Sequence, residues 1–176
     1  MNIFILDTHP VFAAEMLCDK HIVKMTLETA QLLSNVYHIA LKGTNPFVSM
    51  MEYDIQIVPL YKLTHAHHPC SIWTQHSQKN FEWLLHHGIA LYKEYFLRYK
   101  KIHKSQKVID WCVNHKSMIR FQMLDMQEFI QAIPEQYKCL NPVDGYRKYY
   151  LKEKMRFAKW EHSRKVPEWI ICASNK

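Results

Sequence analysis

Residues 19–38, DKHIVKMTLETAQLLSNVYH, carry the pattern that decides the fold. On a helix that advances about 100° per residue, most of the circumference is apolar or small, and one strip is polar. A helix on the outside of a globular protein is usually polar over much of its surface. We therefore expect a central helix whose polar strip faces a cleft. The strip consists of His21, Lys24, Glu28, Gln31, Asn35 and His38.

The helical pattern continues on both sides of this stretch. It begins at Val11, after the helix-start residues Thr8-His9-Pro10, and runs to about Leu41, with Gly43 as a stop signal. Because so long a helix seldom stays straight, we expect a kink near Cys18-Asp19.

Further helices are predicted over residues 72–100, where Ser71 is the expected cap, and over 104–114, 125–132 and 142–160. Residues 2–6 form a short β-type run, and residues 53–58 allow a short strand or an extended loop. The apolar tail 167–172 is expected to pack back beside the first run. We predict a mostly helical, all-α fold, with residues 1–176 as a single domain and a minor two-stranded pairing of the N- and C-terminal segments.

Composition excludes several classes of protein. The chain has 176 residues, is 48% hydrophobic and has only three glycines, which argues against disorder and against β folds with many tight turns. Charges or histidines interrupt every apolar stretch, so we expect no membrane span. The five cysteines form no CxxC pair, which favours reduced thiols. We expect a monomer in the cytoplasm (the host cytoplasm if the protein is viral).

Charge is divided unevenly along the chain. Residues 1–92 have a net charge of −2, whereas residues 93–176 have a net charge of +9. Nine of the twelve histidines lie in the first part. A cationic half of this kind favours a polyanionic partner, and we expect double-stranded DNA. Amines and rings alternate in one basic segment, as a nucleic-acid surface requires; they are Arg147, Lys148, Tyr149, Lys152 and Lys154.

Asp19-Lys20-His21, followed by Glu28 seven residues after the histidine, resembles the phage pyrimidine-dimer DNA glycosylase family (endonuclease V type). His68-Pro69-Cys70-Ser71-Ile72-Trp73 is similar to a second segment of that family, and the resemblance covers about the first 100 residues. It implies an all-helical base-excision enzyme that flips a nucleotide and cleaves its N-glycosidic bond, with or without AP-lyase activity. No cofactor is implied.

In that family the free N-terminal amine attacks C1′ and a helix glutamate assists, and Glu28 is the matching position. The chain begins Met1-Asn2 where the family exposes a small residue, and a bulky second residue usually leaves the methionine on. The nucleophile is therefore left open among the N-terminal amine of Met1, Lys24, Lys20 and water. His21 is expected to orient Glu28 or a phosphate. Family arginines beside the glutamate are replaced here, which leaves the modified base open. Further substrate or phosphate contacts are expected from Asp19, Lys20, Gln31, His65 and His68.

Two other functions stay open at this point. The chain is a non-catalytic nucleic-acid-binding protein if its polar strip is merely solvated. It is a metal-dependent enzyme acting on nucleotides or bases if the histidine-rich loop binds a metal, for which His65, His67 and Cys70 are weak candidates.

Overall fold

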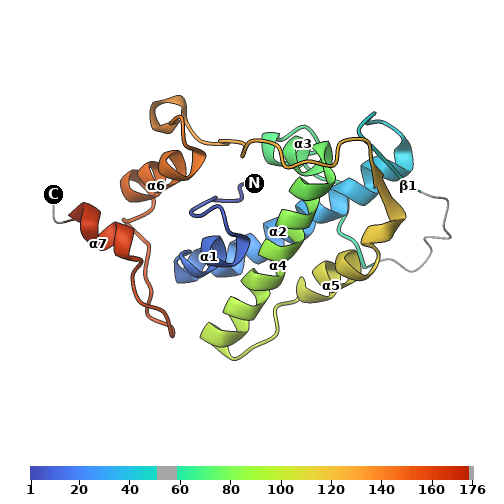
Figure 1. Ribbon diagram of the computed structural model, residues 1–176. Coiled ribbons are helices and arrows are strands. Elements are labelled where there is room, and N and C mark those ends of the chain that lie inside the picture. The colour runs from blue at the N-terminus through green and yellow to red at the C-terminus, as the bar shows by residue number, and fades with distance from the viewer. Residues whose placement is uncertain (51–58, 175–176) are drawn as a thin grey trace.

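A computed structural model describes residues 1–50 and 59–174, and within them two long helices form the centre of the molecule. Helices α2 (Asp19–Lys42) and α4 (Gln78–Tyr99) pack against each other, and α1 (Pro10–Glu15), α3 (Pro69–His76) and α5 (Gln106–Asn114) pack around them (Figure 1). Helices α6 (Pro142–Glu153) and α7 (Glu168–Ser174) lie beyond the N-terminal segment. The prediction of a mostly all-α fold is confirmed.

The first predicted helix is broken rather than kinked. The break falls at the expected place, over Met16, Leu17 and Cys18, and Cys18 has an extended backbone. Tertiary contacts take up the backbone groups that the break frees. The Cys18 N–H donates to the Tyr150 hydroxyl at 3.0 Å, and Arg98 Nη1 donates to the Leu17 carbonyl at 2.8 Å. As predicted, α2 ends at Gly43, which has a φ of 63°.

The second predicted helix, 72–100, is also two helices. It begins earlier, because His68 caps α3 and Pro69 occupies its first turn, where a proline costs no hydrogen bond. Ser77 is extended and starts α4 by accepting the Asn80 N–H on its hydroxyl. The prediction that Ser71 caps this helix was therefore wrong.

Two other helix predictions were wrong in part. Residues 125–132 form no helix, because this segment bonds to neighbouring elements: Gln127 N–H donates to the Asn80 side chain, and Trp73 Nε1 donates to the Glu128 carbonyl. Helix α6 ends at Glu153, well before residue 160. The short 3-10 turns η1 (Lys116–Met118) and η2 (Glu135–Tyr137) complete the helical elements of the described residues.

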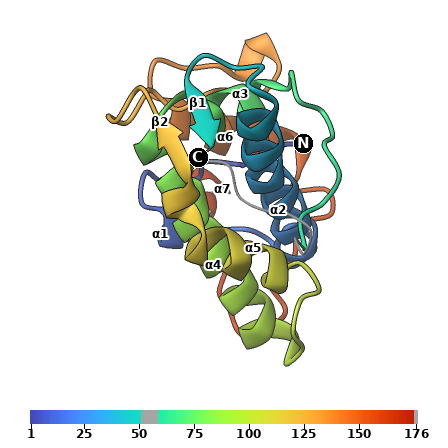
Figure 2. The same ribbon diagram turned by 90° about the vertical axis from the view of Figure 1, so that its right-hand side faces the viewer.

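The small sheet joins other segments than we expected. Strands β1 (Val48–Met50) and β2 (Ile119–Phe121) pair antiparallel, with Ser49 opposite Arg120 (Figure 2). Residues 2–6 form no strand, and the C-terminal segment is helix α7, so the predicted pairing of the two termini was wrong. The strand or loop predicted at residues 53–58 lies outside the described residues.

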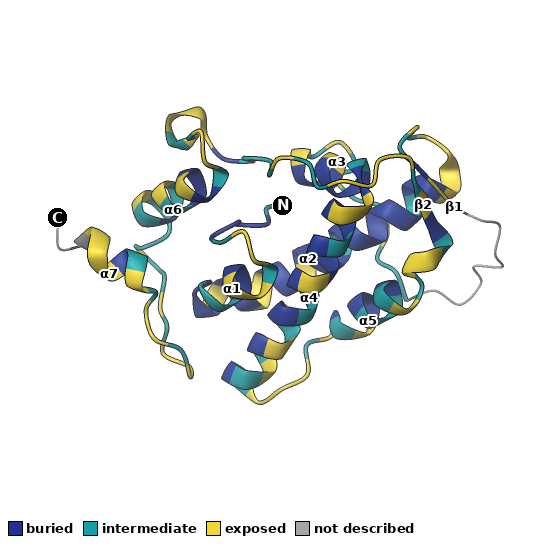
Figure 3. Cartoon of the chain, viewed as in Figure 1, coloured by how far each residue is buried: buried dark blue, intermediate teal, exposed yellow. Residues whose placement is uncertain are grey.

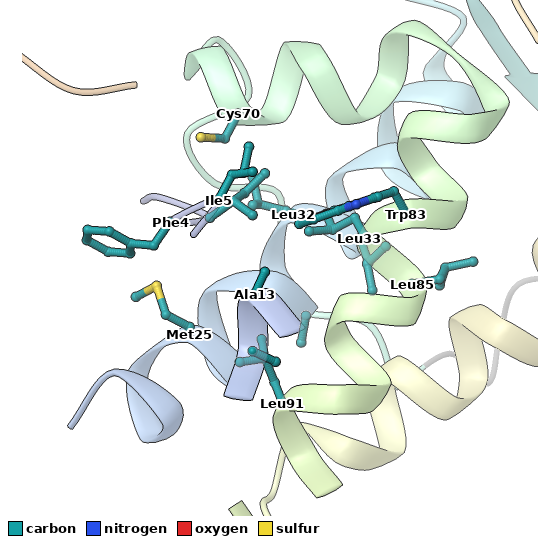
Figure 4. Packing of buried hydrophobic residues seen from close by; sticks show 14 of the residues in the cluster. Phe4, Ile5, Ala13, Met25, Leu32, Leu33, Cys70, Trp83, Leu85 and Leu91 are labelled. Carbon is teal, nitrogen blue, oxygen red and sulfur yellow. The ribbon is translucent and has the colours of Figure 1, made fainter. Parts of the chain in front are cut away.

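The N-terminal segment is buried inside the molecule instead. Ile3, Ile5 and Leu6 are fully buried, and Figure 4 shows Phe4 and Ile5 among side chains from α1 to α4. Buried positions are dense along α2 and sparser along α7 (Figure 3). This burial holds Asn2 against the side of α2. None of the helices within the described residues has the length and apolarity to cross a bilayer.

Candidate active site

Glu28 is the carboxylate of the polar strip on α2, and it is buried. Its side chain is 12% exposed. Oε2 accepts a hydrogen bond from the backbone N–H of Asn2 at 2.8 Å, and Oε1 lies 3.5 Å from Nζ of Lys24, one turn earlier. Glu28 therefore joins the N-terminal segment to an exposed amine.

A concave site of about 530 Å³ opens beside this pair. Its walls come from the N-terminal segment, α2, α6 and the turn after α6. Three of the lining side chains carry ammonium groups, so the concavity attracts anions. The lining residues are Asn2, Phe4, Lys20, His21, Lys24, Tyr149, Lys154 and Phe157.

His21 forms part of the inner wall as a neutral ring. Burial, with the nearby charges of Lys154 and Lys24, lowers the pKa of His21 to about 4. The ring stacks on Phe4, with 4.6 Å between centroids, and its buried Nδ1 has no hydrogen-bond partner in the part of the chain that the structure describes. His21 is thus uncharged near neutral pH and offers one unused ring nitrogen.

Two aromatic rings and one lysine form the part of the lining next to His21. The rings of Phe4 and Tyr149 are nearly parallel, with an interplanar angle of 6° and centroids 6.2 Å apart. Nζ of Lys154 lies 4.5 Å from the Tyr149 ring and 5.9 Å from the Phe4 ring. A cation over an aromatic face is attracted by the ring quadrupole. The wall combines stacking surface with positive charge.

The backbone of Phe4 adopts an uncommon conformation, with φ at 54°. The Asn2 side chain supports it, because Oδ1 accepts the N–H groups of both Ile3 and Phe4. The side-chain Nδ2 of Asn2 also donates to the Ala132 carbonyl at 2.8 Å. Asn2 therefore fixes the segment that carries the Phe4 ring into the site.

The second half of the histidine-rich loop approaches the same carboxylate. Burial lowers the pKa of His68, the Met1 ammonium and His65 lower it further, and Glu28 opposes them. Burial raises the pKa of the Cys70 thiol to about 12, and Met1 and Glu28 also act on it. His68 and Cys70 thus lie near Glu28, on the Met1 side, whereas His65 and His67 are exposed.

The loop offers a poor donor set for a metal. A cysteine ligates a metal as its thiolate, and burial raises the pKa of the Cys70 thiol to about 12. His68 uses Nδ1 to accept the Cys70 N–H. Within residues 1–50 and 59–174, no three His, Cys, Asp or Glu side chains are grouped so as to hold a metal ion.

Asp19 and Arg147, which we expected to contact substrate, hold the fold together. Asp19 is 6% exposed, ion-pairs with Arg98 at 3.1 Å and accepts the Glu161 N–H at 2.7 Å. Arg147 donates to the Leu6 carbonyl at 2.9 Å and lies 3.7 Å from Asp7. The expectation that they bind phosphate does not fit these placements, because both charges are already paired within the fold.

The far half of the polar strip is structural as well. Asn35 is fully buried and bonds to Thr64, and His38 Nε2 bonds to the Tyr61 carbonyl at 2.8 Å. These contacts fasten the segment before α3 to α2. Gln31, half-buried, lies outside the lining of the concave site. The predicted cleft is therefore confined to the first half of the strip.

The basic segment on α6 divides by helix face. Tyr146 and Tyr150 are fully buried, while Lys148 and Lys152 are exposed on the outside of the helix. Only Tyr149 and Lys154 of this segment line the concave site. Lys148 and Lys152 form instead a cationic surface next to it.

Sequence reasoning missed three lining residues, Asn2, Phe4 and Phe157. Asn2 and Phe4 lie in an apolar run that we interpreted as a strand, and Phe157 lies in a stretch that we interpreted as helix. The polar character of Asn2 within an apolar segment was the one signal available, because a polar amide there needs hydrogen-bond partners.

The geometry can be compared with known proteins. Residues 1–107 match the family model described as pyrimidine dimer DNA glycosylase. No curated protein and no solved structure gave a match. The matched range includes Asn2, His21, Lys24, Glu28 and the loop that ends at Cys70.

Proposed function

The chain belongs to the pyrimidine dimer DNA glycosylase family, and on that premise we propose that it excises a damaged pyrimidine from duplex DNA by an amine nucleophile that Glu28 assists. The single observation that carries the proposal is the 2.8 Å contact between the Asn2 backbone nitrogen and Glu28. DNA is the substrate of the family. The nucleophile, its proton acceptor and the entry of the nucleotide are the parts that we propose.

The nucleophile is the α-amine that removal of Met1 creates on Asn2. This nitrogen is at present an amide and already contacts the carboxylate, and Asn2 is one of the residues that line the concave site. Met1 does not line that site, and the charge of its amine instead lowers the pKa values of His68 and Cys70. Of the sequence-based candidates, Lys24 stays as the alternative, because its Nζ lies 3.5 Å from Glu28.

The chemistry balances with these groups alone. The neutral amine forms a bond to C1′, and the C1′–N bond breaks, with its electron pair leaving on the base. Glu28 accepts the proton that the attacking amine loses. The C1′–O4′ bond then breaks with its electron pair going to O4′, which takes the proton back from Glu28, and a protonated imine is left between the amine and C1′. Abstraction of the C2′ proton from that imine and loss of the 3′ phosphate would add AP-lyase activity.

The walls of the site suit a nucleotide that has left the helix. Developing positive charge on the sugar is stabilised by the Glu28 carboxylate. The parallel rings of Phe4 and Tyr149 offer a stacking surface, and Lys154 and Lys24 supply charge for the flanking phosphates. Neutral His21 donates or accepts one hydrogen bond without adding charge.

Borohydride trapping tests the nucleophile. The protein is incubated with a duplex that carries one cyclobutane thymine dimer, reduced, digested and analysed by mass spectrometry. We expect a covalent adduct on the N-terminal peptide, at Asn2, with Met1 absent. An adduct at Lys24 would overturn the role of the N-terminal amine, and cleavage without any adduct would overturn the imine itself.

A matched pair of variants completes the test. Lys24→Gln removes the alternative amine and is expected to keep the adduct, whereas Glu28→Gln is expected to lose it. DNA binding that stays intact while no lesion in a panel of damaged duplexes is cleaved would favour a non-catalytic binding protein. We further propose that residues 1–176 act as one domain and as a cytoplasmic monomer.

A further inference from the structure

Leu140 is the most exposed large hydrophobic side chain of the described residues. It lies between η2 and α6 and is 98% exposed. Single exposed leucines are common on protein surfaces, so exposure alone indicates nothing. Two further features indicate a functional role for this leucine: its loop is held in place on both sides, and the loop is connected to the proposed active site.

The chain on both sides of Leu140 is held in place. The Gln131 side chain brackets Cys139: Nε2 donates to the Cys139 carbonyl at 2.7 Å, and Oε1 accepts the Cys139 N–H at 3.0 Å. On the other side, the Asn141 side chain accepts the Val143 N–H at 3.0 Å and caps α6. Leu140 is therefore displayed from an anchored loop and does not sit on a loose one.

A glycine makes this bracket possible. A Cβ at Gly145 would lie 2.3 Å from Oε1 of Gln131 and 3.1 Å from the Tyr137 carbonyl. Any other residue at position 145 would force the Gln131 amide away from Cys139. The loop and the first turn of α6 consequently pack together in this way because position 145 has no side chain.

Hydrogen bonds connect the loop to the active site in three steps. Gln131 is followed by Ala132, whose carbonyl accepts Asn2 Nδ2, and Asn2 contacts Glu28. The ring of Tyr137, at the start of the loop, lies 5.3 Å from the ring of Tyr149, which lines the concave site. In Figure 1 the orange segment that leads into α6 passes near the N-terminus, in agreement with the bond between Asn2 and Ala132. The loop that carries Leu140 is thus connected to the lining of the concave site through Tyr137 and Ala132.

We propose that Leu140 is a wedge that enters the base stack next to the damaged nucleotide and holds the stack open while that nucleotide occupies the concave site. The proposal rests on the proposed function, because the partner that this loop contacts is duplex DNA. Apolar side chains are the groups that proteins insert between base steps, since they fill the gap without leaving a polar group unpaired. Exposed Lys148, whose Nζ bonds to the Gln136 carbonyl of the same loop, places positive charge beside the wedge for the DNA backbone.

Stacking in the bound DNA gives a direct test. The duplex carries a cyclobutane thymine dimer, with 2-aminopurine in the opposite strand beside the dimer, and its fluorescence rises when the base unstacks. We expect Leu140→Ala to lose most of the rise that the wild-type protein causes at saturation. Leu140→Met, which keeps an apolar side chain of similar length, is expected to retain it.

Comparing cleavage of the duplex with cleavage of the single-stranded oligonucleotide shows whether Leu140 opens the base stack or only helps to bind DNA. We expect Leu140→Ala to cleave the duplex about tenfold more slowly, because unstacking is no longer compensated. Cleavage of the single-stranded oligonucleotide with the same dimer should change less than about twofold, since no stack must be opened. Ile102→Ala, which removes another exposed side chain at the turn after α4, is the control and should change neither rate.

The outcomes distinguish this inference from the proposed function. An equal fluorescence rise with Leu140→Ala and wild type, or an equal loss of rate on single-stranded and duplex DNA, would overturn the wedge while leaving the enzyme intact. A fluorescence rise that depends on Leu140, without any cleavage by the wild type, would support the wedge and overturn the proposed chemistry.

Discussion

The backbone nitrogen of Asn2 and the carboxylate of Glu28, 26 positions apart in the chain, meet at 2.8 Å. The contact exists because residues 3–6 are buried among the central helices, which leaves Asn2 facing the side of α2.

Glu28→Gln keeps the shape of the side chain but cannot accept a proton. We expect it to slow excision of a thymine dimer by 100-fold or more, the size of effect seen for a general base.

Binding provides the control for that variant. Affinity for the uncleaved duplex is expected to stay within about threefold of the wild type, because Glu28 holds no phosphate. A parallel loss of affinity and rate would show that Glu28 helps to hold the DNA. Glu82→Gln, at a half-buried position of α4 away from the lining of the concave site, serves as a matched carboxylate that should leave both unchanged.

Extension of the chain at its start tests the N-terminal amine. Two residues added before Met1, Gly and Ser, keep the nitrogen of Asn2 as an amide, so it cannot form an imine. We expect borohydride trapping to disappear and binding to the duplex to persist. The same two residues added after Lys176 are the control, and trapping that survives the N-terminal extension would assign the nucleophile to a lysine.

Lys154 is the cation closest to the rings of the concave site. Lys154→Gln should weaken DNA binding, and the slope of log K against log salt concentration should become shallower by about 0.9, as expected for the loss of one phosphate contact. Lys42→Gln, at the exposed end of α2, is the matched control. An unchanged slope for Lys154→Gln would mean that its charge acts only on the rings.

Arg98 holds two buried carboxylates, Asp19 at 3.1 Å and Glu94 at 3.0 Å, and is itself fully buried at the side chain. Arg98→Met should lower the free energy of unfolding by about 3–5 kcal/mol, because it leaves the buried Asp19 carboxylate without a cation and leaves Glu94 with Arg164 alone. Urea denaturation measures this change. Lys79→Met breaks an exposed pair with Asp125 and should leave the free energy of unfolding nearly unchanged, because solvent screens both charges.

His87 makes stability depend on pH. Burial lowers the pKa of His87 to about 4, although its hydrogen bond to the Pro10 carbonyl opposes the shift. The unfolded chain takes up a proton near pH 6.5 and the folded chain only near pH 4, so stability is full above pH 6.5 and falls as the pH drops toward 4. We expect a loss of about 2 kcal/mol between pH 7 and pH 4.5 from this residue.

The variant His87→Gln keeps a donor for Pro10 and has nothing to titrate. Its unfolding free energy at pH 7 is expected to be lower than that of the wild type, and its decline toward pH 4.5 shallower. Parallel declines in the two proteins would show that other groups cause the acid sensitivity. His21, with a pKa also near 4, should produce the part of the decline that remains.

The helical class and the central helix could be predicted because they depend on local pattern. The apolar surface of residues 19–42 and the glycine at its end are properties of the chain itself, and the structure ends α2 at Gly43. Helix breaks could not be predicted in the same way. The gap at Met16–Cys18 persists because Arg98 and Tyr150, from distant positions, satisfy the freed backbone groups.

For the candidate site, the sequence by itself determined the family signature and the residue types: Glu28 seven positions after His21, with Lys24 between them. Periodicity also placed these three on one face of one helix. Only the tertiary structure decided what faces them, because the burial of residues 3–6 brings Asn2 and Phe4 to Glu28, and because paired charges keep Asp19 and Arg147 within the fold. A local pattern specifies which side of a helix is polar, whereas the partner of that side depends on how hydrophobic segments far apart in the chain pack together.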